Sequence, residues 1–145
     1  NATLEHIVQQ SRVLAARHGV KVIFVDYVQL IKAPGESKRE IVETASHGLK
    51  DIARELEVPL VAAAQLNRNS DGRAPLLGDF QHSSALEQDA DTAILMEWLK
   101  TVEGQPSDRM RLHIAKNRDG RKCAFDVNFF ADIMRFQEIK NDNHA

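Results

Sequence analysis

Cysteine, long apolar runs and an excess of positive charge are all missing from this sequence of 145 residues. Its single cysteine, Cys123, excludes a disulfide framework and any zinc site built from several cysteines. No apolar run approaches the roughly 20 residues that cross a membrane, and no secretory signal pattern opens the chain. With 19 Lys and Arg against 21 Asp and Glu, the chain is not a strongly basic nucleic-acid binder. This charge balance does not exclude a local basic site. We therefore expect a soluble protein of a reducing, intracellular compartment without a membrane partner.

The composition is that of an ordinary globular domain. Hydrophobic residues make up 43% of the chain and charged residues 28%, and the length fits one domain. We interpret residues 1–2 as a cloning remnant, residues 3–139 as one domain and residues 140–145 as a polar tail. Cys123 alternates with apolar positions, so we expect it to be a buried small hydrophobe.

Two stretches carry the apolar periodicity of amphipathic helices. Thr3 is a candidate N-cap and Gly19 a candidate C-terminal residue of left-handed conformation, which predicts a helix over 3–18. Ser37 opens a capping box, and apolar residues then recur every three or four positions, which predicts a helix over about 37–57.

Two apolar runs predict parallel strands that are buried on both faces. Residues 20–25 end abruptly at Asp26, and residues 60–65 end at Gln65. With the helix between them, they form a strand–helix–strand unit, which we expect to be parallel and right-handed. A long polar loop over 66–80 follows, and long loops in compact domains are usually functional.

The second half of the sequence changes to an antiparallel pattern. Two alternating apolar runs flank Asp119-Gly120, which predicts a hairpin. The other expected elements are a short helix at 83–89, a third buried strand at 92–96, a loop at 100–108 and a last strand at 133–139. The predicted fold class is therefore α/β, with parallel strands and flanking helices followed by an antiparallel meander.

Three positions could carry phosphate chemistry. A carboxylate such as Asp26 at the tip of a buried strand can hold Mg²⁺ beside nucleotide phosphates, and Gln65 could orient a water or sense a γ-phosphate. Lys116 and Arg118 at the hairpin could stabilise phosphate charge in a neighbouring molecule. Taken singly, each has a plainer interpretation: a carboxylate that caps a loop, an amide bonded to loop backbone, and a solvated turn.

The combination of motifs is more specific than any one of them. They occur in the order D-Y-V-Q-L at 26–30, Q-L-N-R at 65–68, S-A-L-E-Q-D-A-D at 84–91, A-K-N-R-D-G at 115–120 and M-R-F at 134–136. This order and spacing resembles the C-terminal RecA-like ATPase domain of DnaB-family replicative helicases, over nearly the whole chain. The resemblance implies part of a RecA-like P-loop NTPase core that uses ATP and Mg²⁺.

The resemblance also implies roles for single residues in nucleotide chemistry. Asp26 matches the Walker B carboxylate for Mg²⁺, and Gln65 matches the sensor glutamine that couples the γ-phosphate to the DNA-facing loop. Arg118 matches the arginine finger that reaches the ATP of the neighbouring subunit, with Lys116 as its companion cation. Arg135 belongs to a matching C-terminal motif and is a candidate nucleotide contact.

The loops after the second strand are the implied DNA-binding region. Candidate DNA contacts are Arg68, Gln81, His82 and Ser84. Gln81 stands where the family often has a cation, so this loop neutralises less DNA charge, and we expect its binding to depend less steeply on salt.

The implied parent protein is a hexameric ring that uses ATP to move 5′→3′ along single-stranded DNA. Its implied partners are other copies of itself, primase and a helicase loader, in the cytoplasm of a bacterium or of a phage-infected host. This sequence has no G-x-x-x-x-G-K-[ST] phosphate-binding loop, so we expect the chain alone to be inactive. In RecA-like sheets the strand of that loop lies between two strands present here, so we also predict a disturbed or self-associating sheet.

Two other interpretations stay open at this point. One is a RecA- or RadA-type recombinase or a related ATPase of the same fold, although the E-Q-D-A-D and K-x-R-x-G motifs argue against it. A remnant of an ATPase that only binds DNA or partner proteins would explain the missing phosphate-binding loop.

Overall fold

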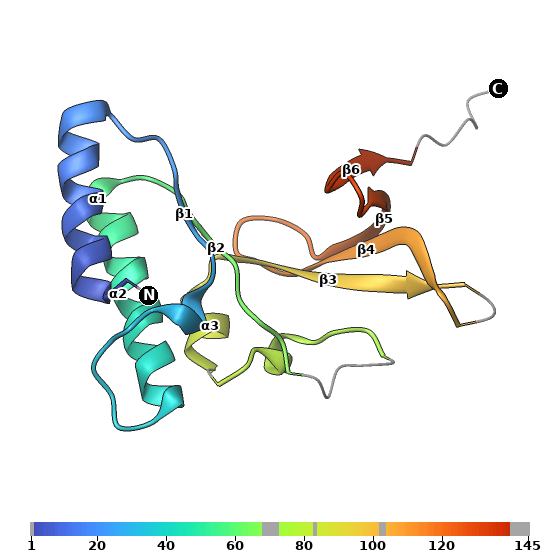
Figure 1. Ribbon diagram of the computed structural model, residues 1–145, viewed down its shortest axis with the longest axis horizontal. Coiled ribbons are helices and arrows are strands. Elements are labelled where there is room, and N and C mark those ends of the chain that lie inside the picture. Colours follow the sequence, from blue (N-terminus) through green and yellow to red (C-terminus); the bar gives the residue numbers. More distant parts are fainter. Residues whose placement is uncertain (1, 68–72, 83, 102–103, 140–145) are drawn as a thin grey trace. The chain divides into compact units, whose positions relative to one another are not determined.

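The computed structural model describes residues 2–67, 73–82, 84–101 and 104–139 (Figure 1). The chain divides into two compact units. The first consists of Asn1–Asn69 and Gly78–Ala90, and the second of Ser70–Leu77 and Asp91–Ala145. Arg68 and the predicted tail at 140–145 lie outside the described residues.

Both predicted helices of the first unit are confirmed, because their start signals act as expected. In α1 (Leu4–His18) the Thr3 hydroxyl accepts a hydrogen bond from the His6 N–H at 3.2 Å. In α2 (Lys38–Leu56) the Ser37 hydroxyl accepts one from the Glu40 N–H, also at 3.2 Å. Each hydroxyl pairs one of the N–H groups that a helix start leaves without a partner.

The two helices end in the same left-handed conformation. Gly19 follows α1 with φ 60°, and its N–H donates to the carbonyl of Ala15. Glu57 follows α2 with φ 53°, and its N–H donates to the carbonyls of Ala53 and Arg54. Glycine adopts this backbone without steric cost, whereas a glutamate does not.

The strand–helix–strand unit is parallel, as predicted. β1 (Ile23–Val25) pairs with β2 (Leu60–Ala62), with Phe24 opposite Val61. The hydrophobic core consists of buried residues from η1 (Val28–Leu30), the residue that follows it and α2. Its members are Val28, Ile31, Val42, Ala45 and Leu49.

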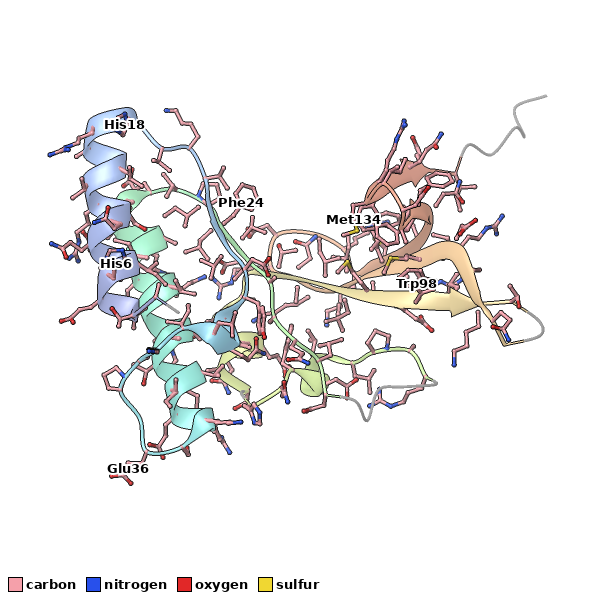
Figure 2. The ribbon with its side chains drawn as sticks, in the orientation of Figure 1. His6, His18, Phe24, Glu36, Trp98 and Met134 are labelled. Carbon is pink, nitrogen blue, oxygen red and sulfur yellow. The ribbon has the colours of Figure 1, made fainter. Side chains whose placement is uncertain are left out.

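The prediction that these strands are buried on both faces is wrong. Val25 and Leu60 pack against the core, but Phe24, which is labelled in Figure 2, is 72% exposed and Val61 is 52% exposed. Successive side chains of a strand point to opposite faces, so the core reaches only one face of the β1–β2 pair. An apolar run such as residues 20–25 is typical of a strand that is covered on both faces. Here the core covers only one of the two faces.

A short helix, α3 (Ser84–Asp89), packs against α2 within the first unit. The Asp89 carboxylate joins the two helices: it accepts a hydrogen bond from the Ser46 hydroxyl at 2.6 Å and lies 2.8 Å from Nδ1 of His47. The predicted helix at 83–89 is confirmed over 84–89, and residue 83 lies outside the described residues.

The second unit is the predicted antiparallel meander. Its sheet has the order β3 (Thr92–Lys100), β4 (Pro106–Asn117), β5 (Cys123–Phe130) and β6 (Arg135–Glu138). The expected loop at 100–108 is shorter than predicted, because β4 begins at Pro106.

Two predictions about this sheet need correction. The segment 92–96 is part of the antiparallel sheet, and its burial alternates: Ala93 and Leu95 are buried, whereas Ile94 and Met96 are exposed. Cys123 is exposed, because it lies at the start of β5 rather than among the buried residues of that strand.

The two faces of the meander differ in chemistry. One holds a small core of Met110, Val127 and Phe129. Trp98 of β3, labelled in Figure 2, packs edge-on against Phe129 with 5.4 Å between ring centroids. The other face carries the ion pairs Arg111–Asp126 at 2.6 Å and His113–Glu97 at 2.8 Å. Among the described residues, no helix has the length and apolar character needed to cross a membrane.

Candidate functional site

The carboxyl ends of β1 and β2 bring two of the predicted residues to one edge of the sheet. Asp26 follows β1 directly, and the peptide bond that joins it to Tyr27 is cis. Beyond the strands the pairing continues, because the Ala63 N–H donates to the Val25 carbonyl at 2.9 Å. Gln65 lies two residues further along this second segment. Polar side chains at the carboxyl ends of parallel strands are placed to meet a ligand.

The Asp26 carboxylate fits a magnesium ligand. It is exposed, and within the described parts of the chain it makes neither a hydrogen bond nor an ion pair. Mg²⁺ is commonly held by one or two carboxylates together with water and substrate phosphates. No group of three or more His, Cys, Asp or Glu among the described residues could hold a metal ion, so Asp26 would act without a protein cage.

The backbone of Gln65 is fixed by a residue for which the sequence motifs gave no role, Gln29. The Gln65 N–H donates to Oε1 of Gln29 at 3.2 Å, and Nε2 of Gln29 donates back to the Gln65 carbonyl at 3.2 Å. That carbonyl also accepts from the Gln81 N–H at 3.0 Å. Gln29 belongs to the D-Y-V-Q-L motif, but its spacing from Asp26 does not reveal which backbone its side chain meets.

The candidate DNA-binding loop pairs with the segment that follows β2. Leu66 and Phe80 form an isolated antiparallel bridge, and the Asn67 N–H donates to the Asp79 carbonyl at 2.7 Å. His82 is exposed and adopts a left-handed backbone with φ 68°. Gln81 is half-buried, and Ser84 is exposed at the start of α3.

The second unit holds the two candidate cations of the hairpin. Lys116 lies on β4 opposite Ala93, and Arg118 follows the end of β4. The Arg118 guanidinium lies 2.7 Å from the Asp91 carboxylate, and the backbone N–H of Arg118 donates to the Asp91 carbonyl at 2.9 Å. Both side chains are about half exposed, at 56% and 50%, so the guanidinium is oriented but stays accessible to solvent.

A β-bulge directly precedes these cations. Ala93 pairs with Lys116, but Ile94 pairs with Ile114, so Ala115 is an extra residue on β4. Bulges of this kind re-aim side chains and are frequent beside active sites. The sequence did not reveal the bulge, because the alternation of Met110, Leu112 and Ile114 with their neighbours continues without a break to Ala115.

Arg135 lies elsewhere in the same sheet. It is exposed on the edge strand β6 opposite Phe130, two strands away from Lys116. Its neighbour Phe136 packs against Phe129 with 4.6 Å between ring centroids.

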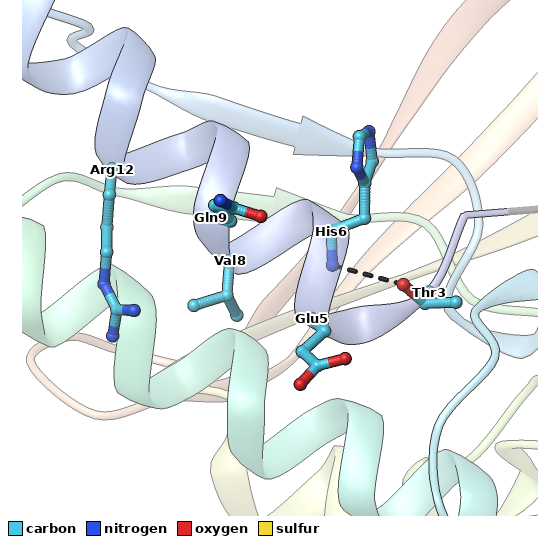
Figure 3. Close-up of a pocket in the computed structure, with 6 residues that line it drawn as sticks. All are labelled: Thr3, Glu5, His6, Val8, Gln9 and Arg12. Atoms are coloured by element: carbon cyan, nitrogen blue, oxygen red, sulfur yellow. Dashed lines mark hydrogen bonds between the residues drawn. The ribbon is translucent and has the colours of Figure 1, made fainter.

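A pocket on the surface of the first unit is unrelated to these residues. It is lined by the first turns of α1 and the residue before it, with the hydrogen bond from His6 to Thr3 at one side (Figure 3). Its lining residues are Thr3, Glu5, His6, Val8, Gln9 and Arg12. None of the predicted site residues contributes to it.

Comparison with known proteins identifies the family. A family model described as the DnaB-like helicase C-terminal domain matches residues 1–138. This chain belongs to that family. The DnaB-like assignment covers the order of motifs from Asp26 to Arg135 and confirms the predicted resemblance.

Relatives of known name agree with this assignment. The chain is 35% identical to the replicative DNA helicase DnaB of Leifsonia xyli subsp. xyli, with 96% of this chain and 32% of that protein covered. It is also 35% identical to the DnaB of Treponema pallidum, with 87% and 28% covered. The chain thus spans about a third of the length of these curated DnaB relatives.

Two solved structures share the fold of this DnaB-like chain. A DnaB-like replicative helicase, described together with its interactions with primase, matches 96% of this chain with a TM-score of 0.84 and 26% identity. The match covers 36% of that helicase. A second structure, described as an ATPase domain, matches 96% of this chain and 52% of its own, with a TM-score of 0.86 and 27% identity. The predicted α/β fold of a helicase ATPase domain is therefore confirmed.

Proposed function

We propose that this chain is part of the motor domain of a hexameric replicative DNA helicase, which couples ATP hydrolysis to 5′→3′ movement along single-stranded DNA and to unwinding. The family and the named relatives support this proposal. The observation that carries it is the edge of the β1–β2 pair, where Asp26 and Gln65 each follow the carboxyl end of a paired strand and the backbone of Gln65 is bonded to the loop at 79–82.

In this proposal each residue at the edge has a distinct task. Asp26 acts as the Walker B carboxylate and holds Mg²⁺, directly or through water. Mg²⁺, when bound there, would neutralise part of the negative charge of the phosphates. Gln65 acts as the sensor: its backbone is fixed, while its exposed side-chain amide is free to meet the γ-phosphate. The phosphate-binding loop that this sequence lacks belongs, in the proposal, to another part of the parent protein.

The hairpin of the second unit serves a neighbouring subunit. Arg118 acts as the arginine finger and Lys116 as its companion, so that Asp26 and Arg118 of one chain serve different ATP molecules. Asp91 holds the guanidinium of Arg118 before it engages phosphate. Arg135 is proposed as a contact to the nucleotide.

The proposed partners follow from the same assignment. Single-stranded DNA would meet Arg68, Gln81, His82 and Ser84, and six copies of the chain would form the ring. Primase is a proposed partner because one structural relative is described with its primase interactions, and a loader follows from the family resemblance. The relatives are bacterial, so we place the protein in the cytoplasm of a bacterium or of a phage-infected host.

The proposal is tested by Arg118→Ala in the whole helicase. We expect ring assembly and ATP binding to persist while steady-state turnover falls by about 10³-fold or more, as for other arginine fingers. Arg121→Ala is the matched control, because Arg121 is an exposed arginine of the same hairpin turn. Unchanged turnover in Arg118→Ala would remove the finger assignment and favour the alternative of a non-catalytic module.

Mixed rings test whether Arg118 acts on the neighbour's ATP. Neither Asp26→Asn nor Arg118→Ala rings should turn over ATP. In a random 1:1 mixture, about a quarter of the subunit interfaces combine an intact Asp26 with an intact Arg118 from the next subunit. We expect turnover to reappear in the mixture. Inactive mixed rings would contradict a finger that acts between subunits.

A further inference from the structure

The side chain of Gln29 joins the two segments that the proposed function makes responsible for nucleotide sensing and DNA contact. We propose that Gln29 is a positioning residue that couples the sensor Gln65 to the DNA-facing loop at Gln81, so that movement of one segment is transmitted to the other. This inference rests on the proposed function and adds to it a residue that transmits the signal.

The hydrogen bonds use both N–H donors of the Gln29 amide and one of the two acceptor positions of its oxygen. Its Oε1 accepts from the Gln65 N–H at 3.2 Å, while its Nε2 donates to the Gln65 carbonyl at 3.2 Å and to the Gln81 carbonyl at 3.5 Å. The bond to Gln81 is the longest and therefore the weakest of the three. A primary amide is the side-chain group that offers an acceptor and two donors together, which explains why this position suits glutamine.

Gln29 is attached to a rigid part of the first unit. Its neighbours in the sequence belong to η1 and the core, where Val28 is 1% exposed and Ile31 6% exposed. The Val28 N–H also donates to the Ala63 carbonyl at 3.0 Å. The base of the Gln29 side chain is thus fixed, and its amide holds the two segments from that fixed point.

The segments that Gln29 joins also contact each other. The Gln81 N–H donates to the Gln65 carbonyl at 3.0 Å, so this carbonyl accepts from both Gln81 and Gln29. A displacement of Gln65 towards a nucleotide therefore changes bonds to the loop as well as to Gln29. Removing the Gln29 amide leaves the backbone bonds from Gln81 to Gln65 and from Asn67 to Asp79 in place. We expect this loss to weaken the coupling between ATP and DNA more than it weakens the chemical step.

The first experiment is Gln29→Met in the whole helicase, which keeps the length of the side chain and removes its hydrogen bonds. We expect ATP turnover without DNA to fall by a smaller factor than its stimulation by DNA, because Gln29 contacts the backbone of Gln65 and none of the proposed catalytic side chains is changed. Stimulation of turnover by a single-stranded oligonucleotide should fall by about 5-fold or more, the lower end of typical coupling between sites. Gln29→Glu keeps the acceptor and loses both donors, so its stimulation should be intermediate.

The matched control is Gln10→Met, since Gln10 is an exposed glutamine of α1. Ring assembly and the KM for ATP are measured for every variant. If Gln29→Met rings do not assemble, Gln29→Asn, which keeps the amide on a stem one methylene shorter, replaces it.

Hydrogen exchange provides a readout that does not depend on activity. In Gln29→Met the amides of residues 63–67 and 79–82 should exchange faster than in wild type and in Gln10→Met. Unchanged exchange together with unchanged stimulation would overturn the role of Gln29 while leaving the proposed function intact. A wild-type helicase without DNA-stimulated turnover would overturn both.

Discussion

At the scale of single residues, the two helix ends show the same left-handed backbone conformation adopted by two different residue types, a glycine and a glutamate. Gly19 and Glu57 have nearly the same φ, 60° and 53°, and each N–H donates to carbonyls of the last helical turn. A β-carbon added at Gly19 would meet no atom within 4 Å, so a substitution there changes backbone strain and not packing. Substitutions at these two sites therefore measure the energetic effect of the left-handed backbone conformation.

We predict that Glu57→Gly raises the free energy of unfolding by about 0.5–1 kcal/mol, because it relieves the left-handed strain of a residue with a β-carbon. Gly19→Ala should lower the free energy of unfolding by about 1 kcal/mol for the converse reason. Urea titration of the two variants beside wild type measures both changes. Shifts of the same sign would show that the backbone conformation is not the determining factor.

The site residues that could be predicted from the sequence are those whose place in the fold follows from the local pattern. Asp26 and Gln65 were found because each closes an apolar run, and the structure places both at one sheet edge. The contacts of Gln29 were missed because its bonding partners lie 36 and 52 positions away in the sequence. The Arg118–Asp91 ion pair was missed for the same reason, although both residues belong to the motifs that indicated the family.

At the scale of elements, helices were predicted well and strand environments less well. Helix caps and apolar periodicity are local properties, so α1 and α2 begin and end within a residue or two of their predicted bounds. The burial of a strand depends on what covers each face, which the strand's own sequence does not specify. This explains why Phe24 is exposed and why the segment at 92–96 alternates in burial.

The cross-strand pair Arg111–Asp126 joins β4 to β5 and makes the stability of this sheet depend on pH. Two hydrogen bonds from the Arg111 guanidinium, at 2.6 and 3.1 Å, hold the pKa of Asp126 below its ordinary value. A carboxyl whose pKa is lowered by folding stabilises the folded state above its unfolded pKa, about 3.9. That stabilisation is lost as the pH falls through the lower, folded pKa.

We therefore predict that Asp126→Asn lowers the free energy of unfolding at pH 7 and that its difference from wild type shrinks below about pH 4. Chemical denaturation at pH 7 and pH 3 measures the two differences. Asp132→Asn, an exposed aspartate in the turn before β6, controls for general effects of acid. A difference that stays constant between the two pH values would contradict the role of the ion pair.

At the scale of the whole molecule, apolar surface outweighs charge as a determinant of solution behaviour. The formal net charge is only −2, which gives little mutual repulsion between copies. Phe24 and Val61 lie opposite each other on the uncovered face of the β1–β2 pair. Exposed apolar side chains on a short parallel pair favour association with another surface.

We predict that the 145-residue chain self-associates and that Phe24→Thr shifts it towards monomer, because threonine keeps strand propensity while removing the aromatic ring. Sedimentation velocity at several micromolar concentrations measures the distribution. Ile133→Thr is the control, since this residue is 61% exposed but lies outside the β1–β2 pair. A stable monomer of the wild-type chain would contradict the prediction.

The contrast between the two sheets also determines the order in which this chain can fold. Neighbouring strands of the β3–β6 meander follow one another in the sequence, so each new pairing closes only a short loop. Isolated hairpins form in about 1–10 μs. The β1–β2 pair must instead wait for residues 26–59 to close back on themselves, at a larger entropic cost. We therefore expect the hairpin that carries Arg118 to form before the edge that carries Asp26 and Gln65.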